Sequence, residues 1–377
     1  MKEDIKNLRR ITIIVNSTKV SGAEISLLTT LDTLSSKYSF HVLLPYGSEF
    51  YDRCIGKFTF KQIRFKRFKR TNNLLDLIRS VINVILSGIA ISWYLYKNRI
   101  EIVYSNSNQS HVYIPTIKLL TGKKIILHAR DNVSSRIFAK IFSFYSDKII
   151  CVSKFIYDQI PAMGSKKVII YNGINTADWR PINKNDQLST PNSQQKLLVG
   201  CIGQLIPWKR HTDLINAAEM IIPLFKNVHF ILLGDDLFNE HTEYVSLLKK
   251  IISIKGLSAN FSFLGYSPDI KEILAELDLV VHCADGEPFG RVLIESMSME
   301  KPVVAYNCGG PAEVIEHNFT GYLIDPFDTN LLSAQILDLL NNPTKRDNFG
   351  RNSRCVIKQK FSIELNSKNM ETVFNSI

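Results

Sequence analysis

The sequence predicts an α/β fold with two domains, each a parallel sheet covered by helices on both faces. Short β-branched runs alternate with helical segments from residue 11 to residue 173, and the same alternation restarts at residue 197. Such alternation is typical of doubly wound sheets, and 377 residues are enough for two domains. We therefore expect two Rossmann-like domains that face a cleft, with ligands held at the carboxyl ends of the strands.

A polar segment without hydrophobic periodicity separates the two series of strands. Residues 183–196 read NKNDQLSTPNSQQK, which is typical of a linker. The expected N-terminal domain therefore covers residues 1–182, and the C-terminal domain covers residues 197–355. We expect residues 356–377 to form a helix that crosses back to the N-terminal domain.

Residues 80–96 form an uncharged, mostly apolar run at the lower length limit for crossing a bilayer. The apolar positions Val81, Ile82, Ile85 and Trp93 follow a helical stripe. Two interpretations stay open: a buried amphipathic helix, which we favour, and a membrane-inserted helix. The start of the chain does not resemble a signal peptide, and six cysteines without CxxC or zinc spacing predict neither disulfides nor a metal site. A cytoplasmic protein is expected.

Charge is distributed unequally along the chain. The total is +11, but residues 1–180 carry 28 lysines and arginines against 12 acids, whereas residues 181–377 carry 18 against 23. A basic stretch with interleaved phenylalanines favours contact with an anionic membrane; a solvated edge strand is the alternative, and no nucleic-acid motif accompanies it. The cations assigned to this membrane or acceptor surface are Lys61, Arg64, Lys66, Arg67, Lys69 and Arg70.

Four loops that follow predicted strands carry the candidate chemistry. They read SGAE at 21–24, GQLIPWKR at 203–210, DGEPFGRVLIE at 285–295 and NCGGPAE at 307–313. Small residues that lead into a helix let backbone N–H groups approach a phosphate. Taken singly, each of these loops is also compatible with an ordinary tight connection.

Three charged side chains in these loops have a use in such a site. Lys209 can supply a point charge to a diphosphate, although a surface lysine is the plain alternative. Glu287 and Glu295 stand eight positions apart, one in a loop and one on a helix, where both face the expected cleft. Carboxylates accept hydrogen bonds from sugar hydroxyls.

The motifs together resemble the retaining family 4, or group 1, glycosyltransferases of the GT-B fold, over essentially the whole chain. EPFGRVLIE resembles the E-x7-E signature of that family, and GQLIPWKR resembles its phosphate-binding region. The segments KPVVAYNCGGPAEVI, HNFTGYLIDPFD, YNGINTADWRP and VSGAE resemble the stretches expected around them.

The resemblance implies a role for each matching residue. Lys209 would bind the donor diphosphate, Glu295 the ribose, and Glu287 the transferred sugar. Gly22 would lie beneath the diphosphate, and His128 would lie near the reacting sugar. The implied catalytic residues are His128, Glu287 and Lys209, and the implied substrate-binding residues are Gly22, Gly203, Gln204, Lys209, Phe289, Gly290, Arg291 and Glu295.

One position departs from the family pattern. Gln204 stands where the family usually has an arginine, so it cannot supply a charge to the donor. Arg210 and Arg130 are candidates to compensate, although neither matches the missing arginine by position.

The resemblance implies a retaining, metal-independent transfer from a nucleotide diphosphate sugar, with UDP favoured over GDP. The nucleotide sugar is a co-substrate, so no cofactor is expected. The charge distribution adds a lipid-linked saccharide acceptor in bacterial capsule or lipopolysaccharide assembly. We expect a peripheral protein on the inner face of the cytoplasmic membrane, with no nucleic-acid partner. The alternatives are a GT-B enzyme with a soluble acceptor, an epimerase, and a non-catalytic partner subunit.

Overall fold

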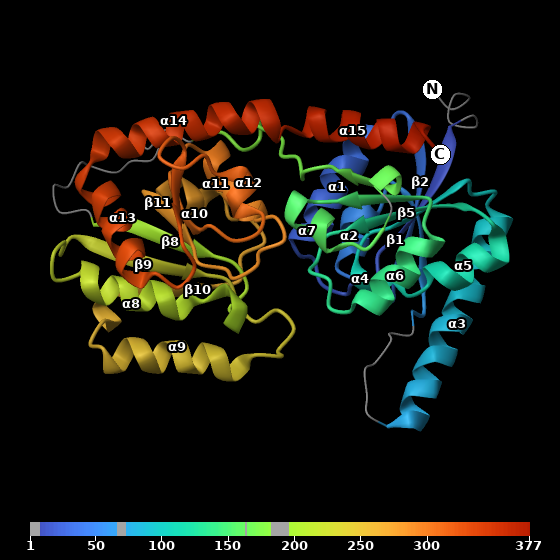
Figure 1. Ribbon diagram of the computed structural model, residues 1–377, viewed down its shortest axis with the longest axis horizontal. Coiled ribbons are helices and arrows are strands. Elements are labelled where there is room, and N and C mark those ends of the chain that lie inside the picture. The colour runs from blue at the N-terminus through green and yellow to red at the C-terminus, as the bar shows by residue number, and fades with distance from the viewer. Residues whose placement is uncertain (1–7, 66–72, 163, 182–195) are drawn as a thin grey trace. The chain divides into compact units, whose positions relative to one another are not determined.

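The computed structural model describes residues 8–65, 73–162, 164–181 and 196–377, and it divides into two compact units (Figure 1). Unit 1 combines residues 1–173 with residues 363–377, and unit 2 covers residues 174–362. The expected linker lies almost wholly outside the described residues. The predicted pair of parallel α/β sheets is confirmed.

The described residues of unit 1 form a seven-stranded parallel sheet in the order β3-β2-β1-β4-β5-β6-β7. Its strands are buried β-branched runs, as expected where helices cover both faces, and Ile13, Val103 and Ile126 have no exposed surface. Its elements are β1 (Arg9–Ile14), α1 (Gly22–Leu34), β2 (Tyr38–Pro45), α2 (Phe50–Cys54), β3 (Thr59–Ile63), α3 (Leu74–Lys97), β4 (Ile102–Ser105), α4 (Asn108–His111), α5 (Ile114–Thr121), β5 (Lys124–Ala129), α6 (Arg136–Tyr145), β6 (Lys148–Cys151), α7 (Lys154–Gln159), η2 (Gly164–Lys166), β7 (Lys167–Ile169) and α15 (Ile363–Asn375).

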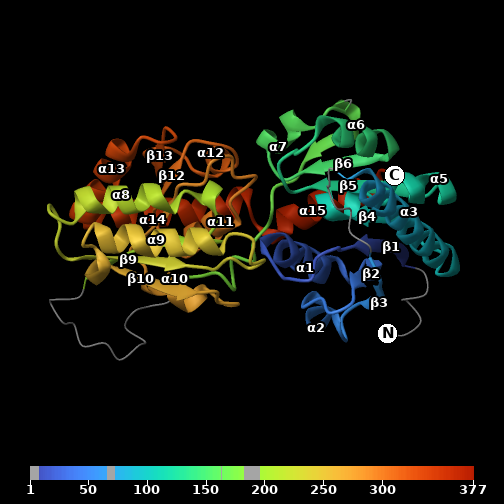
Figure 2. The same ribbon diagram turned by 90° about the horizontal axis from the view of Figure 1, so that it is seen from below.

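The described residues of unit 2 form a six-stranded parallel sheet in the order β10-β9-β8-β11-β12-β13. In Figure 1 its strands lie between α9 on one side and α14 on the other, and Figure 2 shows the same unit from below. Its elements are β8 (Leu197–Ile202), η4 (Pro207–Lys209), α8 (His211–Ile221), β9 (Val228–Leu233), α9 (Thr242–Ile254), η5 (Ser258–Asn260), β10 (Phe261–Gly265), α10 (Lys271–Glu276), β11 (Leu279–His282), α11 (Arg291–Ser298), β12 (Val303–Tyr306), α12 (Pro311–Val314), β13 (Gly321–Ile324), α13 (Thr329–Asn341) and α14 (Pro343–Lys360).

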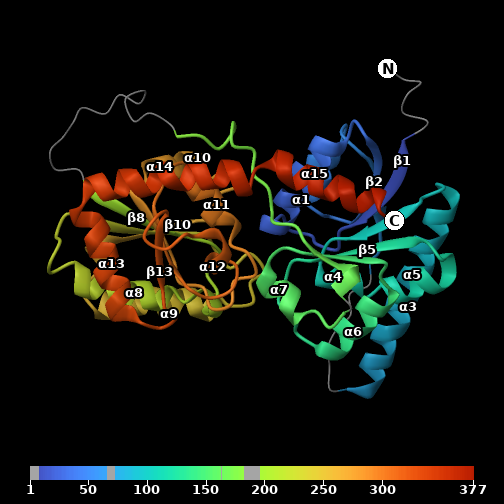
Figure 3. The same ribbon diagram turned by 45° about the horizontal axis from the view of Figure 1, so that its top comes forward.

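The last helix of the chain belongs to unit 1, where it lies beside α1 (Figure 3). It begins at Ile363, and not at 356 as the sequence suggested, because α14 continues to Lys360 within unit 2. The Thr30 hydroxyl donates to Asn366 Oδ1 at 2.9 Å, and Phe374 packs into the core of unit 1. The segment 174–181 lies with unit 2, because Arg354 donates to the carbonyl oxygens of Thr176 and Trp179.

The helix α3 corrects one expectation, because its apolar stripe is exposed. Ile82, Ile85 and Trp93 are 49, 42 and 65% exposed, whereas the opposite face is buried. That buried face combines small residues such as Gly88 with Ile91 and Leu95, and a Cβ added to Gly88 would lie 2.7 Å from Thr116 Cβ on α5. By length and composition α3 could cross a membrane. Only 28% of its most apolar 18-residue window is buried inside the protein.

The basic stretch begins on β3, an edge strand that pairs with β2. Lys61 lies on this strand and Arg64 directly follows it, and both side chains are exposed. The other four cations assigned to this surface, Lys66, Arg67, Lys69 and Arg70, lie outside the described residues.

Candidate functional site

Three loops of unit 2 meet at the carboxyl ends of β8, β11 and β12. The amide of Asp285 donates to the carbonyl oxygen of Trp208 at 2.9 Å, and the amide of Gly310 donates to that of Glu287 at 2.7 Å. β8 and β11 are neighbours where the strand order of the sheet reverses direction, which is the usual ligand position in open α/β sheets. The motifs at 203–210, 285–295 and 307–313 are therefore brought together.

Two adjacent glycines let the loop 307–313 approach the loop 285–295. A Cβ on Gly310 would lie 2.3 Å from Phe289 Cα, and a Cβ on Gly309 would lie 2.3 Å from the Glu287 carbonyl oxygen. Gly309 also has φ +74°, in the left-handed region that favours glycine. Side chains at these positions would push the backbone away from Glu287.

Lys209 and Glu287 form an ion pair at the centre of this cluster. Their side chains are 15% and 11% exposed, and His282 Nε2 lies 3.2 Å from the same Glu287 carboxylate oxygen. Burial alone would raise the pKa of Glu287, but the Lys209 charge and the His282 hydrogen bond outweigh it and hold the pKa well below its usual range. Burial, followed by the Lys209 charge, lowers the pKa of His282, which is therefore neutral at pH 7.

Lys209 is the last residue of the short η4 turn, shortly before α8. Gly203 at the end of β8 has φ +151°, and a Cβ there would lie 3.8 Å from Lys209 Nζ. The ammonium also lies 4.4 Å from the centre of the Trp208 ring. The strand end, the turn and the aromatic ring thus direct a cation towards the carboxylate of the next loop.

A second buried ion pair lies on α11. The helix begins at Arg291, directly after Gly290 with φ +87°, and Arg291 Nε donates to Glu295 at 2.6 Å. Burial raises the pKa of Glu295, although the Arg291 charge opposes this effect. Among the described residues, no partner accepts a hydrogen bond from the buried Arg291 Nη1. Phe289, just before this helix, is buried and contacts the ring of Phe361.

Gln204 is half-buried in the turn after β8, and the structure offers neither suggested arginine as its substitute. Arg210 donates to both carboxylate oxygens of Asp213, at 2.7 and 2.9 Å. In unit 1, Arg130 is buried and donates to Asn106 at 2.9 Å and to Asn172 at 2.7 Å. Each guanidinium therefore already has partners within its own unit.

The two remaining predicted residues lie in unit 1. His128 is buried in β5 and contacts the Tyr104 hydroxyl; burial holds its pKa well below its usual range. Gly22 is the first residue of α1, and the turn before it is fixed by Ser21, whose amide and hydroxyl donate to Glu24 at 3.0 and 2.6 Å. This S-x-x-E capping pattern was readable in the sequence.

Sequence reasoning missed His282, which contacts the central carboxylate. Its signal was a histidine that ends an apolar strand five residues before Glu287. The loops of unit 2 therefore place the Lys209 cation where it can bind a phosphate, and the Glu287 and Glu295 carboxylates where they can accept hydrogen bonds from hydroxyl groups. Such a combination suits a phosphorylated, polyhydroxylated ligand.

Comparison with known proteins agrees with this chemistry. Residues 183–356 match the family model described as glycosyl transferases group 1. This stretch is therefore similar to a group 1 glycosyltransferase domain. It includes Lys209, Glu287 and Glu295, together with all three loops that meet at the sheet edge.

Curated proteins that resemble this chain include glycosyltransferases. An uncharacterized glycosyltransferase of Methanocaldococcus jannaschii is 30% identical over 256 residues, which cover 67% of this chain and 65% of that protein. The poly(ribitol-phosphate) α-N-acetylglucosaminyltransferase of Staphylococcus aureus is 32% identical over 184 residues, covering 48% of this chain and 36% of that protein. The chain thus spans less than two thirds of the length of these relatives.

Solved structures show that the fold is GT-B. Anabaena HepE, in complex with UDP and glucose, has a TM-score of 0.81 at 23% identity and covers 98% of this chain and 100% of its own. Sucrose-phosphate synthase from Thermosynechococcus elongatus has a TM-score of 0.83 at 17% identity, with 98% of both chains covered.

Proposed function

We propose that the protein is a glycosyltransferase that moves a sugar from a nucleotide diphosphate sugar, UDP-linked in preference to GDP-linked, to an acceptor hydroxyl. The observation that carries this proposal is the convergence of three loops of unit 2 on the Lys209–Glu287 pair. A buried ammonium at the carboxyl edge of a parallel sheet is placed to hold a diphosphate.

In this proposal Lys209 binds the donor diphosphate and stabilises the charge that develops on it as the glycosidic bond breaks. Preorganised charges act strongly in such a water-poor site, so the reaction needs no metal ion. Glu295 binds the ribose, and Glu287 binds the transferred sugar together with the backbone of Phe289 and Gly290. The transfer retains the anomeric configuration without a covalent intermediate.

In this proposal the His128 side chain lies beside the reacting sugar. Its lowered pKa makes it a neutral side chain at pH 7, which can exchange hydrogen bonds with hydroxyl groups without adding charge. This role is carried over from the resemblance to retaining group 1 enzymes.

The proposed acceptor is a lipid-linked saccharide in the assembly of a bacterial surface polysaccharide, at the inner face of the cytoplasmic membrane. The cationic excess of residues 1–180 supports an anionic acceptor or membrane. Two relatives are named for related pathways: a lipopolysaccharide core mannosyltransferase of Rhizobium leguminosarum and a capsular polysaccharide glycosyltransferase of Staphylococcus aureus.

A nucleotide-sugar screen by thermal shift, followed by mass analysis of acceptor products, tests the proposal. UDP-sugars should raise the melting temperature of the wild type and of Lys255→Met, which removes an exposed ion pair elsewhere in unit 2. Lys209→Met and Glu287→Gln should lose product formation. A screen without any stabilising nucleotide sugar would refute donor binding, and binding without product or hydrolysis would indicate a non-catalytic subunit.

Two further measurements address the finer claims. NMR of the product reports its anomeric configuration, and inversion would exclude the retaining route. Loss of activity in EDTA, with recovery on adding a divalent cation, would contradict metal independence.

A further inference from the structure

An uncharged cavity of about 460 Å³ lies in unit 1 among α3, α5 and α6. Its volume falls within the usual range for sites that bind organic molecules. It reaches the carboxyl ends of β1 and β5, where Asn16, Leu127 and Ala129 line it. Among the described residues that line the cavity, none carries a charge.

The two ends of the cavity differ in chemistry. Val84 and Ile85 of α3, with Phe138 and Phe142 of α6, form an apolar end. At the other end, the buried Asn16 amide is fixed because its Nδ2 donates to the Gln109 carbonyl and the Tyr113 hydroxyl, and its Oδ1 has no partner within the described chain.

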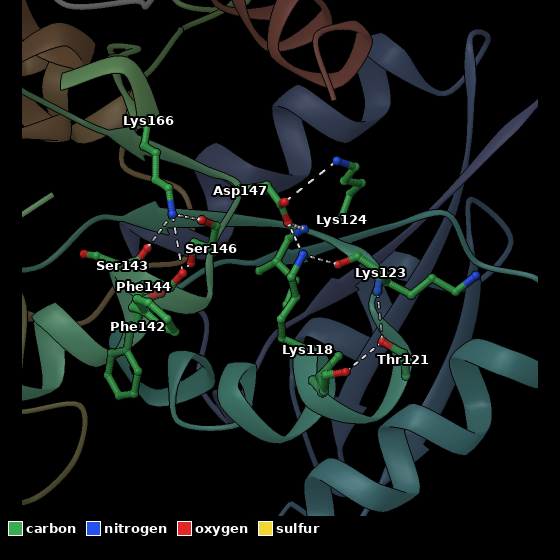
Figure 4. Close-up of polar contacts among 12 residues, drawn as sticks. Lys118, Thr121, Lys123, Lys124, Phe142, Ser143, Phe144, Ser146, Asp147 and Lys166 are labelled. Carbon is green, nitrogen blue, oxygen red and sulfur yellow. Dashed lines mark hydrogen bonds and ion pairs between the residues drawn. The ribbon is translucent and has the colours of Figure 1, made fainter. Parts of the chain in front are cut away.

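The helices around this cavity are held in place by polar tethers (Figure 4). Lys166 donates to the carbonyl oxygens of Ser143, Phe144 and Ser146 at 3.0–3.4 Å, at the C-terminal end of α6. Lys118 on α5 donates to Asp147 at 2.7 Å, just after α6. The close packing of Gly88 on Thr116 fixes α3 against α5 as well, so the cavity has firm walls.

The apolar end opens onto an exposed hydrophobic surface. Ile78, Ile82, Ile85, Ile89 and Trp93 recur at helical spacing on one face of α3, and each is at least 42% exposed. Ile85 both lines the cavity and belongs to this row. Contiguous exposed apolar surface of this kind marks a site of interaction with a membrane or another protein.

Charge favours a membrane lipid over a protein partner. The two helices carry the cations Arg79, Lys97, Arg136 and Lys140 against one acid, Asp76. Cations around an uncharged cavity suit an amphiphile with an anionic headgroup, in which the hydrocarbon enters and the charge stays outside. Because its other face is packed on α5, α3 lies in position to rest in a membrane surface, and not to cross it alone.

We propose that the α3–α6 face docks on an anionic membrane and that the cavity receives the hydrocarbon chain of the lipid-linked acceptor. The hydrocarbon chain lies between α3 and α6, and the headgroup stays outside the cavity. This assignment rests on the proposed function for the identity of the lipid as acceptor, but lipid binding itself requires neither donor nor catalysis.

The test therefore measures binding without any nucleotide sugar. Co-sedimentation with vesicles of phosphatidylglycerol and phosphatidylcholine reports docking, and titration with hexadecyl phosphate reports filling of the cavity, with inorganic phosphate as the headgroup control. The wild type should bind the mixed vesicles and hexadecyl phosphate, but not inorganic phosphate. Ile85→Glu should lower vesicle binding at least about tenfold, since it buries a charge in the lipid interface.

Ala139→Phe, inside the cavity on α6, should weaken hexadecyl phosphate at least about tenfold while vesicle docking persists. Leu224→Glu, an exposed position in unit 2, should change neither measurement. The comparison requires that the variants melt at the same temperature as the wild type. If Ala139→Phe does not fold, the result for Ile85→Glu alone decides. Unchanged binding in both cavity variants, or a lipid-independent dimer that covers α3, would overturn the proposal. The thermal-shift screen with nucleotide sugars is independent of these lipid-binding measurements, and it tests the proposed function.

Discussion

Replacing Lys209 with methionine should leave the Glu287 carboxylate buried without its cation. Both side chains are mostly buried, and of the two partners described for this carboxylate only His282, at 3.2 Å, would remain. Breaking one side of a buried ion pair typically costs about 3–5 kcal/mol, and the histidine places the expected loss near the lower figure. For a unit of this size, about 3 kcal/mol corresponds to a melting temperature lower by about 6–12 °C.

The stability lost in Lys209→Met should depend on pH. The direction of this dependence follows from the pKa of Glu287 in the folded protein compared with its pKa in the unfolded protein. In the wild type the folded pKa lies below the unfolded value, so the pair stabilises unit 2 above the ordinary carboxyl range and the stabilisation disappears as the pH falls through the folded pKa. Without Lys209, burial raises the pKa of Glu287, and the variant recovers stability as the pH falls towards that raised value. The deficit at pH 8 should therefore exceed the deficit at pH 5.

Urea unfolding at both pH values measures this difference. Glu287→Gln in the Lys209→Met background should recover part of the loss, because no charge stays buried. Lys255→Met, which breaks an exposed pair with Glu219, should cost less than about 1 kcal/mol. Equal deficits at pH 5 and pH 8, or a double variant no more stable than the single one, would refute the reasoning.

Two further predictions concern backbone approach and buried histidines. Gly310→Ala should lower the melting temperature of unit 2 and weaken UDP binding, because the added Cβ would lie 2.3 Å from Phe289 Cα. Gly164→Ala should be tolerated, because the nearest atom to its added Cβ is 3.7 Å away. Equal effects of the two substitutions would contradict the predicted clash. Burial lowers the pKa of His111 in unit 1 and of His211 in unit 2 to about 3. Each of these histidines should therefore cost its unit about 1.4 kcal/mol of stability per pH unit as the pH falls below 6.5, and this loss should level off near pH 3. Melting curves from pH 7.5 to 5 measure this slope, and a flat profile would show that neither histidine is neutral and buried.

The positions of the strands along the chain and of the loops that follow them could be predicted from the sequence because they rest on local patterns. Buried β-branched runs predicted the strands, and the carboxyl ends of parallel strands necessarily share one edge of a sheet. The contact of His282 with Glu287 was not readable, because a histidine at a strand end gives no sign of which side chain faces it. The pairing of Arg210 with Asp213 likewise depends on the side-chain direction of Arg210, whose own φ is +55°.

The orientation of α3 could not be read from its hydrophobic stripe. Periodicity identifies two faces of a helix, but burial is decided by which face allows closer packing. Gly88 lets the backbone of α3 approach α5, and Ile91 and Leu95 are buried on that same side of the helix, so the stripe that contains Ile82, Ile85 and Ile89 is left outside. A stripe rich in isoleucine therefore predicted the helix correctly and its buried face wrongly.

The return of α15 to unit 1 has a consequence for the order of events during synthesis. Met370 and Phe374 complete the core of unit 1, yet they leave the ribosome after every residue of unit 2. Unit 2 is contiguous and can fold as soon as it has emerged, whereas the first unit to be translated must wait for the last residues of the chain. Its exposed intermediate, with α3 already apolar on the outside, is the form that chaperones would need to protect.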